Sequence, residues 1–320
     1  MALRVLVVGG TGFLGYHVVR ELVARGHEVT VAVRRPGTTV AAPDVTLRMI
    51  DVTDPGRLPD LVEHHDGLVF AAGADDRAVP PAPAYYYFEA RNVEPVRRLM
   101  AAAARTGCAR AVVLGSYFTT LHRQWPQLGL PVSHPYIRSR VEQARAAEEA
   151  AGDRTAVTVL EIPFTFGATP GRPSLWAPLA RWMRSPLPLM APPGGTAVVT
   201  TRTVARAAVG ALEQRASGPY PVVDENVSWE RLLARLAQAA GRPRPVHRLP
   251  PALLRSAAAP AAFLHAARGR EPGLRPAALP ALLTRELFLD PTACRTLTGE
   301  PPPSVDEALA ATLRGCAVGS

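Results

Sequence analysis

The sequence contains no lysine, and all 36 of its basic residues are arginine. Lysine is ordinarily among the commonest residues, so its absence is a property of the whole chain and not of one site. We attribute it to a coding bias toward arginine. Because this bias acts on the whole chain, the net charge of +9 is weak evidence for an acidic partner. The arginines are scattered and form no basic tail. Aromatic residues make up only 6% and do not alternate with arginines, so we expect no nucleic-acid partner.

The chain is equally poor in cysteine and in long apolar runs. Cys108, Cys294 and Cys316 are too few and too scattered for a disulfide framework or a zinc site, so we expect no metal and a reducing compartment. No run reaches the roughly 18 apolar residues of a membrane span; the alanine-rich stretch 257–267 is broken by a proline and a histidine. The first apolar run leads into glycines and not into a signal-peptide pattern. We therefore expect a cytoplasmic protein without a membrane partner.

Short apolar runs alternate with amphipathic ones in the first half of the chain. The apolar runs are rich in β-branched residues and predict strands at residues 3–8, 28–33, 45–50, 67–72, 110–115 and 156–162. Helical patterns separate most of them, at residues 13–25, 57–64, 91–105 and 136–151. Buried strands that alternate with helices form a parallel sheet covered on both faces. The sequence therefore predicts an α/β fold with a doubly wound, Rossmann-type parallel sheet.

The composition of the chain changes after residue 160: this half contains 22 of the 33 prolines. Proline cuts this half into short helices and loops. One strand–helix–strand passage, at 196–224, is predicted to return to the main sheet. We therefore assign residues 1–167, together with 196–224, to the sheet domain. The remainder of 168–320 is predicted to form a smaller, mostly helical C-terminal lobe that binds the substrate.

A glycine-rich turn, "VVGGTGFLG", follows the first strand and opens a helix. Gly9 permits a tight turn, Gly12 lets a diphosphate approach the backbone, and Gly15 lets helix and strand pack closely. The free N–H groups at the start of the helix attract the diphosphate. We predict a dinucleotide site built by Gly9, Thr11, Gly12, Phe13, Leu14 and Gly15.

The end of the second strand selects the nucleotide. An NAD site usually carries an acid here, which binds the adenosine ribose, whereas this sequence has Arg34 and Arg35. Guanidinium groups suit a 2′-phosphate. We therefore predict NADP, bound as NADPH, in preference to NAD.

The stretch "SHPYIRSRVEQ" places Arg140 one helical turn after Tyr136, so that the cation can reach the phenol. A free phenol has a pKa near 10, and a fixed cation favours the phenolate and lowers that pKa. A carbonyl that receives a hydride needs a proton donor within hydrogen-bond reach. The pair is therefore suited to proton transfer at a substrate oxygen.

Six stretches match one known pattern of spacing over roughly residues 1–245. They are "GGTGFLG", "IDVTD", "RNVEPVRRLMAAAARTG", "CARAVVLGS", "YIRSR" and "SGPYPVVDENVSWERLLARLAQAAG". Together they resemble the extended short-chain dehydrogenases/reductases, the NAD(P)-dependent epimerase/dehydratase family. The resemblance places Ser116, Tyr136 and Arg140 in the catalytic group, with Asn92 supporting it. It also implies a homodimer formed through the helices at 91–105 and 136–151.

The resemblance further implies which residues contact the cofactor besides the glycine turn and the two arginines. Asp51 and Val52 would flank the adenine. The other expected contacts, at the nicotinamide and its ribose and phosphate, are Ala71, Ala72, Gly73, Tyr136, Arg140, Pro163 and Thr165.

Arg140 departs from the lysine that is usual in this family. Arginine keeps the positive charge but cannot give up its proton. Its planar guanidinium group also places its hydrogen-bond donors in a different geometry from that of an ammonium group. Any proton relay through the lysine is therefore closed. His134 could replace it as a donor, although a lone loop histidine more often lies on a solvated surface. Glu161 is a second departure, since arginine is frequent at that position.

The sequence leaves the small-molecule substrate unnamed. The aromatic run 85–88 after the fourth strand either offers a wall to a hydrophobic substrate or pins its loop to the sheet. The leading hypothesis is hydride transfer between NADP and a carbonyl or alcohol. Two alternatives stay open: a redox-neutral epimerase or isomerase, and a nucleotide-binding regulator in which Arg140 marks lost chemistry.

Overall fold

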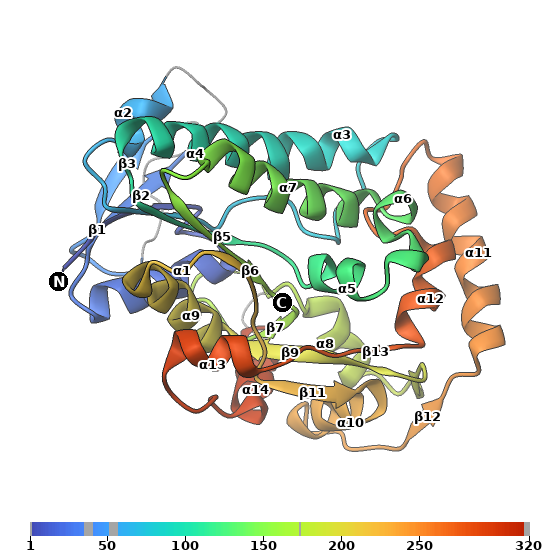
Figure 1. Ribbon diagram of the computed structural model, residues 1–320. Helices are drawn as coiled ribbons and strands as arrows, with labels where there is room; N and C mark the ends of the chain where they lie inside the picture. Colours follow the sequence, from blue (N-terminus) through green and yellow to red (C-terminus); the bar gives the residue numbers. More distant parts are fainter. Residues whose placement is uncertain (1, 35–40, 51–56, 173, 317–320) are drawn as a thin grey trace.

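The computed structural model describes residues 2–34, 41–50, 57–172 and 174–316. Its main sheet has seven strands, and every neighbouring pair is parallel (Figure 1). In spatial order the strands are β10 (Gly218–Pro221), β6 (Ala156–Glu161), β5 (Arg110–Leu114), β4 (Gly67–Phe70), β1 (Arg4–Val8), β2 (Glu28–Val33) and β3 (Thr46–Met49). The predicted doubly wound parallel sheet is confirmed.

Helices cover both faces of this sheet (Figure 1). On one face α1 (Phe13–Ala24) packs against α9 (Thr201–Gln214). The other face carries α2 (Leu58–Val62), α4 (Glu94–Thr106) and α7 (Pro135–Ala151). The central strands are consequently buried on both sides, which explains why they are almost continuous apolar runs in which valine and leucine predominate.

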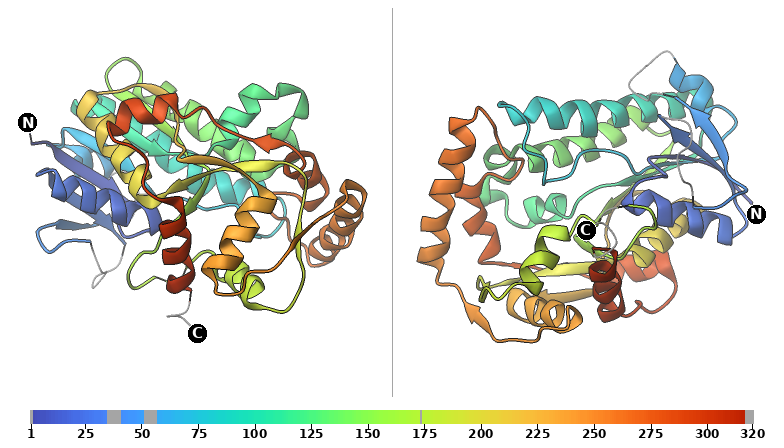
Figure 2. Two further views of the ribbon diagram at one scale, coloured as in Figure 1. Left: turned by 90° about the horizontal axis from the view of Figure 1, so that it is seen from below. Right: turned by 180° about the vertical axis from the view of Figure 1, so that it is seen from behind.

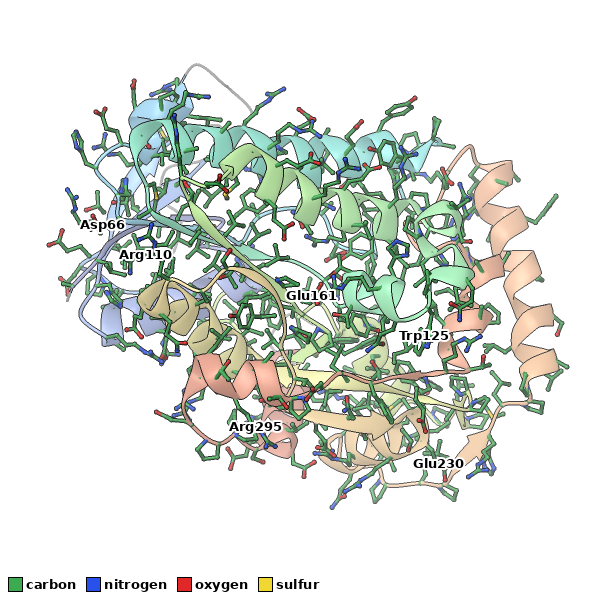
Figure 3. The ribbon with its side chains drawn as sticks, in the orientation of Figure 1. Asp66, Arg110, Trp125, Glu161, Glu230 and Arg295 are labelled. Carbon is green, nitrogen blue, oxygen red and sulfur yellow. The ribbon has the colours of Figure 1, made fainter. Side chains whose placement is uncertain are left out.

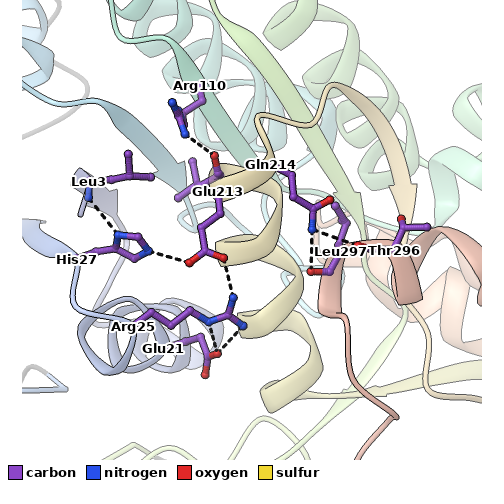
Figure 4. A network of polar contacts seen from close by, with 10 residues as sticks. Leu3, Glu21, Arg25, His27, Arg110, Glu213, Gln214, Thr296 and Leu297 are labelled. Atoms are coloured by element: carbon purple, nitrogen blue, oxygen red, sulfur yellow. Dashed lines mark hydrogen bonds and ion pairs between the residues drawn. The ribbon is translucent and has the colours of Figure 1, made fainter. Parts of the chain in front are cut away.

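Polar contacts hold α9 to its neighbours (Figure 4). Glu213 near the end of α9 pairs with Arg25 at 2.8 Å and with Nε2 of His27 at 3.1 Å. Gln214 donates to the carbonyl of Thr296 at 3.1 Å, in α13 (Thr292–Thr298). A helix from the second half of the chain therefore braces the N-terminal helix.

The strand order reverses between β1 and β4. From β1 the chain proceeds through β2 and β3 on one side, and from β4 it proceeds through β5 and β6 on the other. The loops that follow β1 and β4 thus leave the same edge of the sheet in opposite directions. This is the place where open α/β sheets bind their ligands.

The lobe contains short strands as well as helices. Its central strand β9 (Gly195–Thr200) pairs with β7 (Phe164–Phe166), β11 (Glu225–Ser228) and β13 (Glu286–Leu287), while β8 (Leu189–Ala191) pairs with β12 (Val246–Arg248). Its helices include α8 (Ala177–Arg184), α10 (Trp229–Ala239), α12 (Leu279–Leu283) and α14 (Val305–Gly315).

Helix α11 (Pro251–Ala267) lies at the outer edge of the lobe and runs on through Pro260 (Figures 1 and 2). Among the described residues, no helix is both long enough and apolar enough to cross a membrane.

One part of the passage at 196–224 differs from the prediction. Helix α9 and strand β10 do return to the main sheet, but β9 belongs to the second sheet. All six residues of β9 are buried, because the second sheet is itself enclosed between the main domain and the lobe helices. The sequence of β9 is therefore as apolar as that of a strand in the main sheet. Only its pairing in the folded structure shows to which sheet it belongs.

Candidate functional site

The glycine turn between β1 and α1 is shaped by close backbone contacts. Gly9 has a φ of 86°, and a Cβ atom on it would lie 2.7 Å from the carbonyl carbon of Ala71. A Cβ atom on Gly15 would lie 2.2 Å from the carbonyl oxygen of Gly9. The N–H of Gly12 donates to that same carbonyl at 2.8 Å. The positive φ of Gly9 fits the predicted tight turn, and the close approach at Gly15 fits the predicted close packing of the helix.

The N-terminus of α1 is open to an anion. Gly12 is its N-cap and contributes no side-chain cap, and the first turn carries no acidic residue. Thr11, Phe13 and Leu14 are partly exposed. Free N–H groups at a helix N-terminus next to a glycine turn form the usual cradle for a diphosphate. The residues predicted for a dinucleotide therefore fit one.

Asn92 fixes the loop that follows β4 beside this turn. Its Oδ1 accepts from the N–H of Ala74 at 2.8 Å, and its Nδ2 donates to the Ala74 carbonyl at 3.2 Å. Gly73 has a φ of 130°, and a Cβ atom there would lie 2.6 Å from Oδ1 of Asn92. Asn92 lies in a π-helical turn, η2 (Glu89–Val93), a local irregularity that is frequent at functional sites. The predicted residues Ala71, Ala72 and Gly73 are thus held next to the glycine turn.

Arg140 contacts the phenol of Tyr136 directly. Its Nε lies 3.0 Å from the Tyr136 hydroxyl oxygen, and its guanidinium carbon lies 5.2 Å from the ring centre. The other two guanidinium nitrogens donate to Oε1 of Gln143 at 2.8 Å and to the Ala74 carbonyl at 3.4 Å. The predicted pair of phenol and cation is therefore assembled, with the cation anchored at three points.

Burial has the largest effect on the pKa of Tyr136, which is only 6% exposed. Burial raises the pKa of Tyr136 above its ordinary value, and the nearby carboxylate of Asp76 adds to that rise. The charge of Arg140 and the hydroxyl of Ser116 act in the opposite direction but do not reverse it. Arg140 thus has the expected sign of effect, yet the phenol stays neutral at neutral pH instead of ionising.

Ser116 follows β5 and is anchored through Glu161 at the end of β6 (Figure 3). The Glu161 side chain is fully buried and accepts hydrogen bonds from the hydroxyls of Thr119 and Thr120. Arg123 pairs with it at 2.6 Å. The Thr119 hydroxyl also lies 2.6 Å from the Ser116 carbonyl, so its one proton is shared between that oxygen and Glu161. Glu161, noted in the sequence only as a departure from the family, therefore fixes helix α5 (Phe118–Gln124) and the serine before it.

Gln143 is a site residue that the sequence argument missed. Its Nε2 donates to the Asn92 carbonyl at 2.9 Å, and its Oε1 receives the bond from Arg140. It thereby links Asn92 to the cation. Positions 136, 140 and 143 follow the i, i+4, i+7 spacing of one helix face, so helical periodicity was the signal that could have found it.

Aromatic rings surround the phenol. The ring centres of Phe88 and Phe118 lie 5.6 Å and 6.2 Å from that of Tyr136. A chain of ring contacts then leads into the lobe through Tyr117, Phe164, Phe166, Trp176 and Trp229. A continuous run of aromatic side chains, called the aromatic wall below, therefore leads from the phenol into the lobe.

The aromatic run 85–88 forms a short helix, α3 (Ala84–Phe88), and only its last ring contacts Tyr136. The Tyr85 hydroxyl instead lies within hydrogen-bond distance of the carboxylates of Glu89 and Glu142, and Tyr86 is 66% exposed. Phe88 is covered by a segment from far along the chain: a Cβ atom on Gly273 would lie 2.5 Å from its ring. The Gly273 carbonyl also accepts from the N–H of Tyr136 at 3.0 Å.

His134 does not lie on a solvated surface as expected. It is fully buried, and its Nδ1 accepts from the N–H of Arg275 at 3.0 Å. Burial, reinforced by the charge of Arg275, lowers the pKa of His134 to about 4. The neutral imidazole packs between the start of α7 and the segment at Arg275, and its role is structural.

The remaining predicted contacts fall into two groups. Thr165 and Pro163 lie on the link from β6 to β7, where the Thr165 hydroxyl donates to the Pro163 carbonyl at 3.0 Å and Trp176 donates to the Thr165 carbonyl at 2.8 Å. Arg34 is exposed at the end of β2. The predicted contacts Arg35, Asp51 and Val52 lie outside the described residues.

Two curated proteins show the relationship at the level of sequence. The "Sterol demethylase protein B" of Methylococcus capsulatus is 25% identical over 263 residues, which cover 79% of each chain. A 3-beta-hydroxysteroid dehydrogenase of Mycolicibacterium neoaurum is 32% identical over 116 residues, which are 35% of this chain and 32% of the other.

Solved structures show the likeness of fold. The structure of gox2253 has a TM-score of 0.77 at 23% identity, with 98% of each chain covered. WbmH of Bordetella bronchiseptica, solved in complex with NAD+, has a TM-score of 0.72 at 15% identity over 100% of both chains. The model of the NAD dependent epimerase/dehydratase family matches residues 5–221. The chain belongs to the NAD-dependent epimerase/dehydratase family.

Proposed function

We propose that this protein is an NADP-dependent oxidoreductase that transfers a hydride between the nicotinamide and a carbonyl or alcohol carbon of a small organic substrate. The position of Tyr136 carries the proposal. Its neutral phenol contacts Arg140 and Ser116, and Ser116 follows β5 at the same edge of the sheet where Gly9 follows β1. Parallel strands bring these ends together.

A bound nicotinamide would supply or accept the hydride, and the protein's own residues act on the substrate oxygen. In the reducing direction that oxygen gains negative charge, and the Tyr136 O–H donates its proton to it. The phenolate that remains is stabilised by Arg140 Nε and the Ser116 hydroxyl, which already contact the phenol. Arg140 stays charged and passes no proton.

The choice of NADP rests on the end of β2. Arg34 is exposed there, and no acid stands in the sequence "AVRRPG". A guanidinium group pairs with a 2′-phosphate, whereas an acid would repel it.

The aromatic wall supports an apolar, ring-bearing substrate. Large flat side chains around Tyr136 match an alicyclic or aromatic ring better than a sugar nucleotide, which needs cations for its phosphates. In the lobe, Arg184, Arg242 and Arg244 donate to backbone carbonyls, so these guanidinium groups hold the lobe together. The names of the two curated relatives, which refer to sterols and hydroxysteroids, agree with this class.

A redox-neutral epimerase is the second candidate, because the family that the chain belongs to includes such enzymes. Net turnover separates the two: the oxidoreductase consumes NADPH as product forms, and the epimerase forms product without net change of the cofactor. Tight NADPH binding without any turnover would instead favour a binding role.

The test combines calorimetry with turnover. NADPH should bind more tightly than NADH, and Arg34→Asp should reverse that order, while the matched change Arg231→Asp on an exposed surface of α10 should not. Equal affinities in the parent protein contradict the NADP assignment. NADPH oxidation should then be followed with a panel of cyclic ketones that includes 3-ketosteroids.

A further inference from the structure

Helix α11 carries an apolar face that the rest of the protein leaves uncovered. Leu253 is 55% exposed, Phe263 is 76% exposed and Leu264 is 48% exposed. At 100° per residue, one narrow arc of the helix holds these three and three further exposed residues, which we call the α11 stripe: Leu253, Ser256, Pro260, Phe263, Leu264 and Ala267. The stripe contains no charged side chain.

The other side of α11 packs on η4 (Pro276–Ala278) and α12. The helix therefore belongs to the fold and lies at the edge of the molecule (Figures 1 and 2). The exposure of the stripe residues places them on its solvent side. Val132 on the neighbouring α6 (Leu130–Ser133) is 83% exposed, and Arg275 donates to its carbonyl at 3.5 Å. Exposed apolar surface of this extent and continuity marks a binding surface.

The sequence on both sides of α11 is strongly positive. Residues 242–285 contain eight arginines and one acid, Glu271. That carboxylate is used inside the protein: it accepts from the N–H of Ala84 at 2.7 Å and pairs with Arg275 at 2.6 Å. Arg268 and Arg270 follow the helix directly and are exposed. Arg248, before the helix, is 86% exposed and meets Glu230 at 3.3 Å.

We propose that the α11 stripe docks on an anionic phospholipid bilayer. An apolar helix face flanked by arginines lies in the plane of a membrane, with its apolar side chains among the acyl chains and its guanidinium groups at the phosphates. The absence of a membrane partner was expected because the chain has no spanning segment, but a helix that lies in the interface needs no spanning length.

The docking surface adjoins the site. The segment that follows α11 forms a bridge to Pro81 through Arg270 and then places the Gly273 carbonyl against the N–H of Tyr136. The segment after α11 therefore connects the docking surface to the site directly. The docking itself does not depend on the proposed reaction.

The experiment is flotation of the full-length protein with vesicles of phosphatidylcholine alone and with vesicles that also contain phosphatidylglycerol. The protein should float with the anionic vesicles and remain behind with the neutral ones. Phe263→Glu should reduce the bound fraction by more than about tenfold, since it removes the exposed ring that enters the acyl chains and adds repulsion from the anionic headgroups. Arg268→Glu should reduce it by about tenfold. Met49→Glu, which alters a 61% exposed apolar side chain on β3, should change nothing.

Circular dichroism of each variant shows whether it is folded before flotation. Three results would overturn the proposal. The first is that the parent protein does not bind anionic vesicles, and the second is that Met49→Glu loses as much binding as Phe263→Glu. The third concerns assembly. If light scattering shows a concentration-dependent dimer that Phe263→Glu dissociates, a second copy of the chain covers the stripe.

Discussion

Arg140 Nε donates to the hydroxyl oxygen of Tyr136 across 3.0 Å, so the phenol oxygen is an acceptor and its own proton stays free. A neutral phenol in this position can donate to a substrate oxygen, and the nearby cation then stabilises the phenolate that is left. Because a guanidinium group cannot deprotonate, Arg140 acts by charge and position alone.

The first prediction concerns that charge. Arg140→Ala should lower kcat by about a hundredfold, because it removes the cation that stabilises the phenolate. Arg140→Lys keeps a cation and should stay within about tenfold of the parent. Tyr136→Phe should abolish proton transfer and leave the affinity for NADPH nearly unchanged. Steady-state kinetics and calorimetry measure these effects.

Two outcomes would change the reading of this site. Turnover far above the parent in Arg140→Lys would mean that the arginine damages a dehydrogenase, and a binding role would gain support. Activity that survives Tyr136→Phe would remove the tyrosine from the mechanism.

Gln143 is predicted to position Arg140. Gln143→Leu removes the acceptor for one guanidinium nitrogen and the donor to the Asn92 carbonyl. We expect kcat to fall by about tenfold to a hundredfold, because the cation is no longer fixed, while NADPH affinity is retained. Gln143→Glu restores an acceptor for Arg140 and should recover much of the loss. A fall of the same size in Gln143→Glu would indicate that only the link to Asn92 matters.

Glu161 should be important for stability. Glu161→Ala leaves the buried Thr120 hydroxyl without its acceptor and removes the partner of Arg123. The Thr119 hydroxyl is left with the Ser116 carbonyl alone. The free energy of unfolding should fall by about 3 kcal/mol, as measured by urea denaturation. Glu230→Ala breaks an ion pair on the surface and serves as the control, with an expected loss below about 1 kcal/mol. Equal losses in the two variants would refute the role given to Glu161.

His134 predicts a pH dependence of stability. Its pKa is about 4 in the folded protein and near 6.5 in an unfolded chain. Between these values the unfolded state binds one more proton, so the free energy of unfolding falls as the pH falls from 6.5 toward 4. The contribution of this one residue is about 3 kcal/mol between pH 7 and pH 4.

The variant His134→Asn keeps an acceptor for the N–H of Arg275 and removes the titration. Its stability should therefore decrease less on acidification than that of the parent. His64→Asn, at an 80% exposed side chain, should leave the pH dependence as it was. Identical curves for His134→Asn and the parent would show that His134 titrates normally.

Assembly is the fifth prediction. Helices α4 and α7 lie side by side, and Ala101, Ala104 and Ala150 on them are partly exposed, which allows another helix pair to approach closely. We expect a homodimer through these helices, which Ala104→Glu should dissociate. Light scattering at micromolar concentration measures this, and a monomeric parent protein would contradict it.

The parts of the site that sequence could predict are those set by local spacing. The glycine turn needs residues 9, 12 and 15 between a strand and a helix, and the pair of Tyr136 and Arg140 needs one helical turn. Both patterns can be read within a dozen residues. The resemblance to a family then added Ser116 and Asn92, which the structure brings next to that pair through Ala74 and the Ser116 hydroxyl.

The parts that sequence could not predict depend on contacts between distant segments. Nothing near Glu161 in the sequence shows that three side chains of α5 converge on it. The burial that raises the pKa of Tyr136 comes in part from Gly273, in another part of the chain. The buried position of His134 has the same origin.

The chain passes repeatedly between the main sheet and the lobe, and this limits how the protein can be divided. After β6 it enters the lobe at β7, returns at α9 and β10, leaves again at β11 and returns at α13 (Figure 1). A fragment of residues 1–167 would lack α9 and β10, which would uncover one face of the sheet and leave β6 as a bare edge. Exchange of substrate specificity with a relative is therefore better attempted through single loops than through transplantation of the whole lobe.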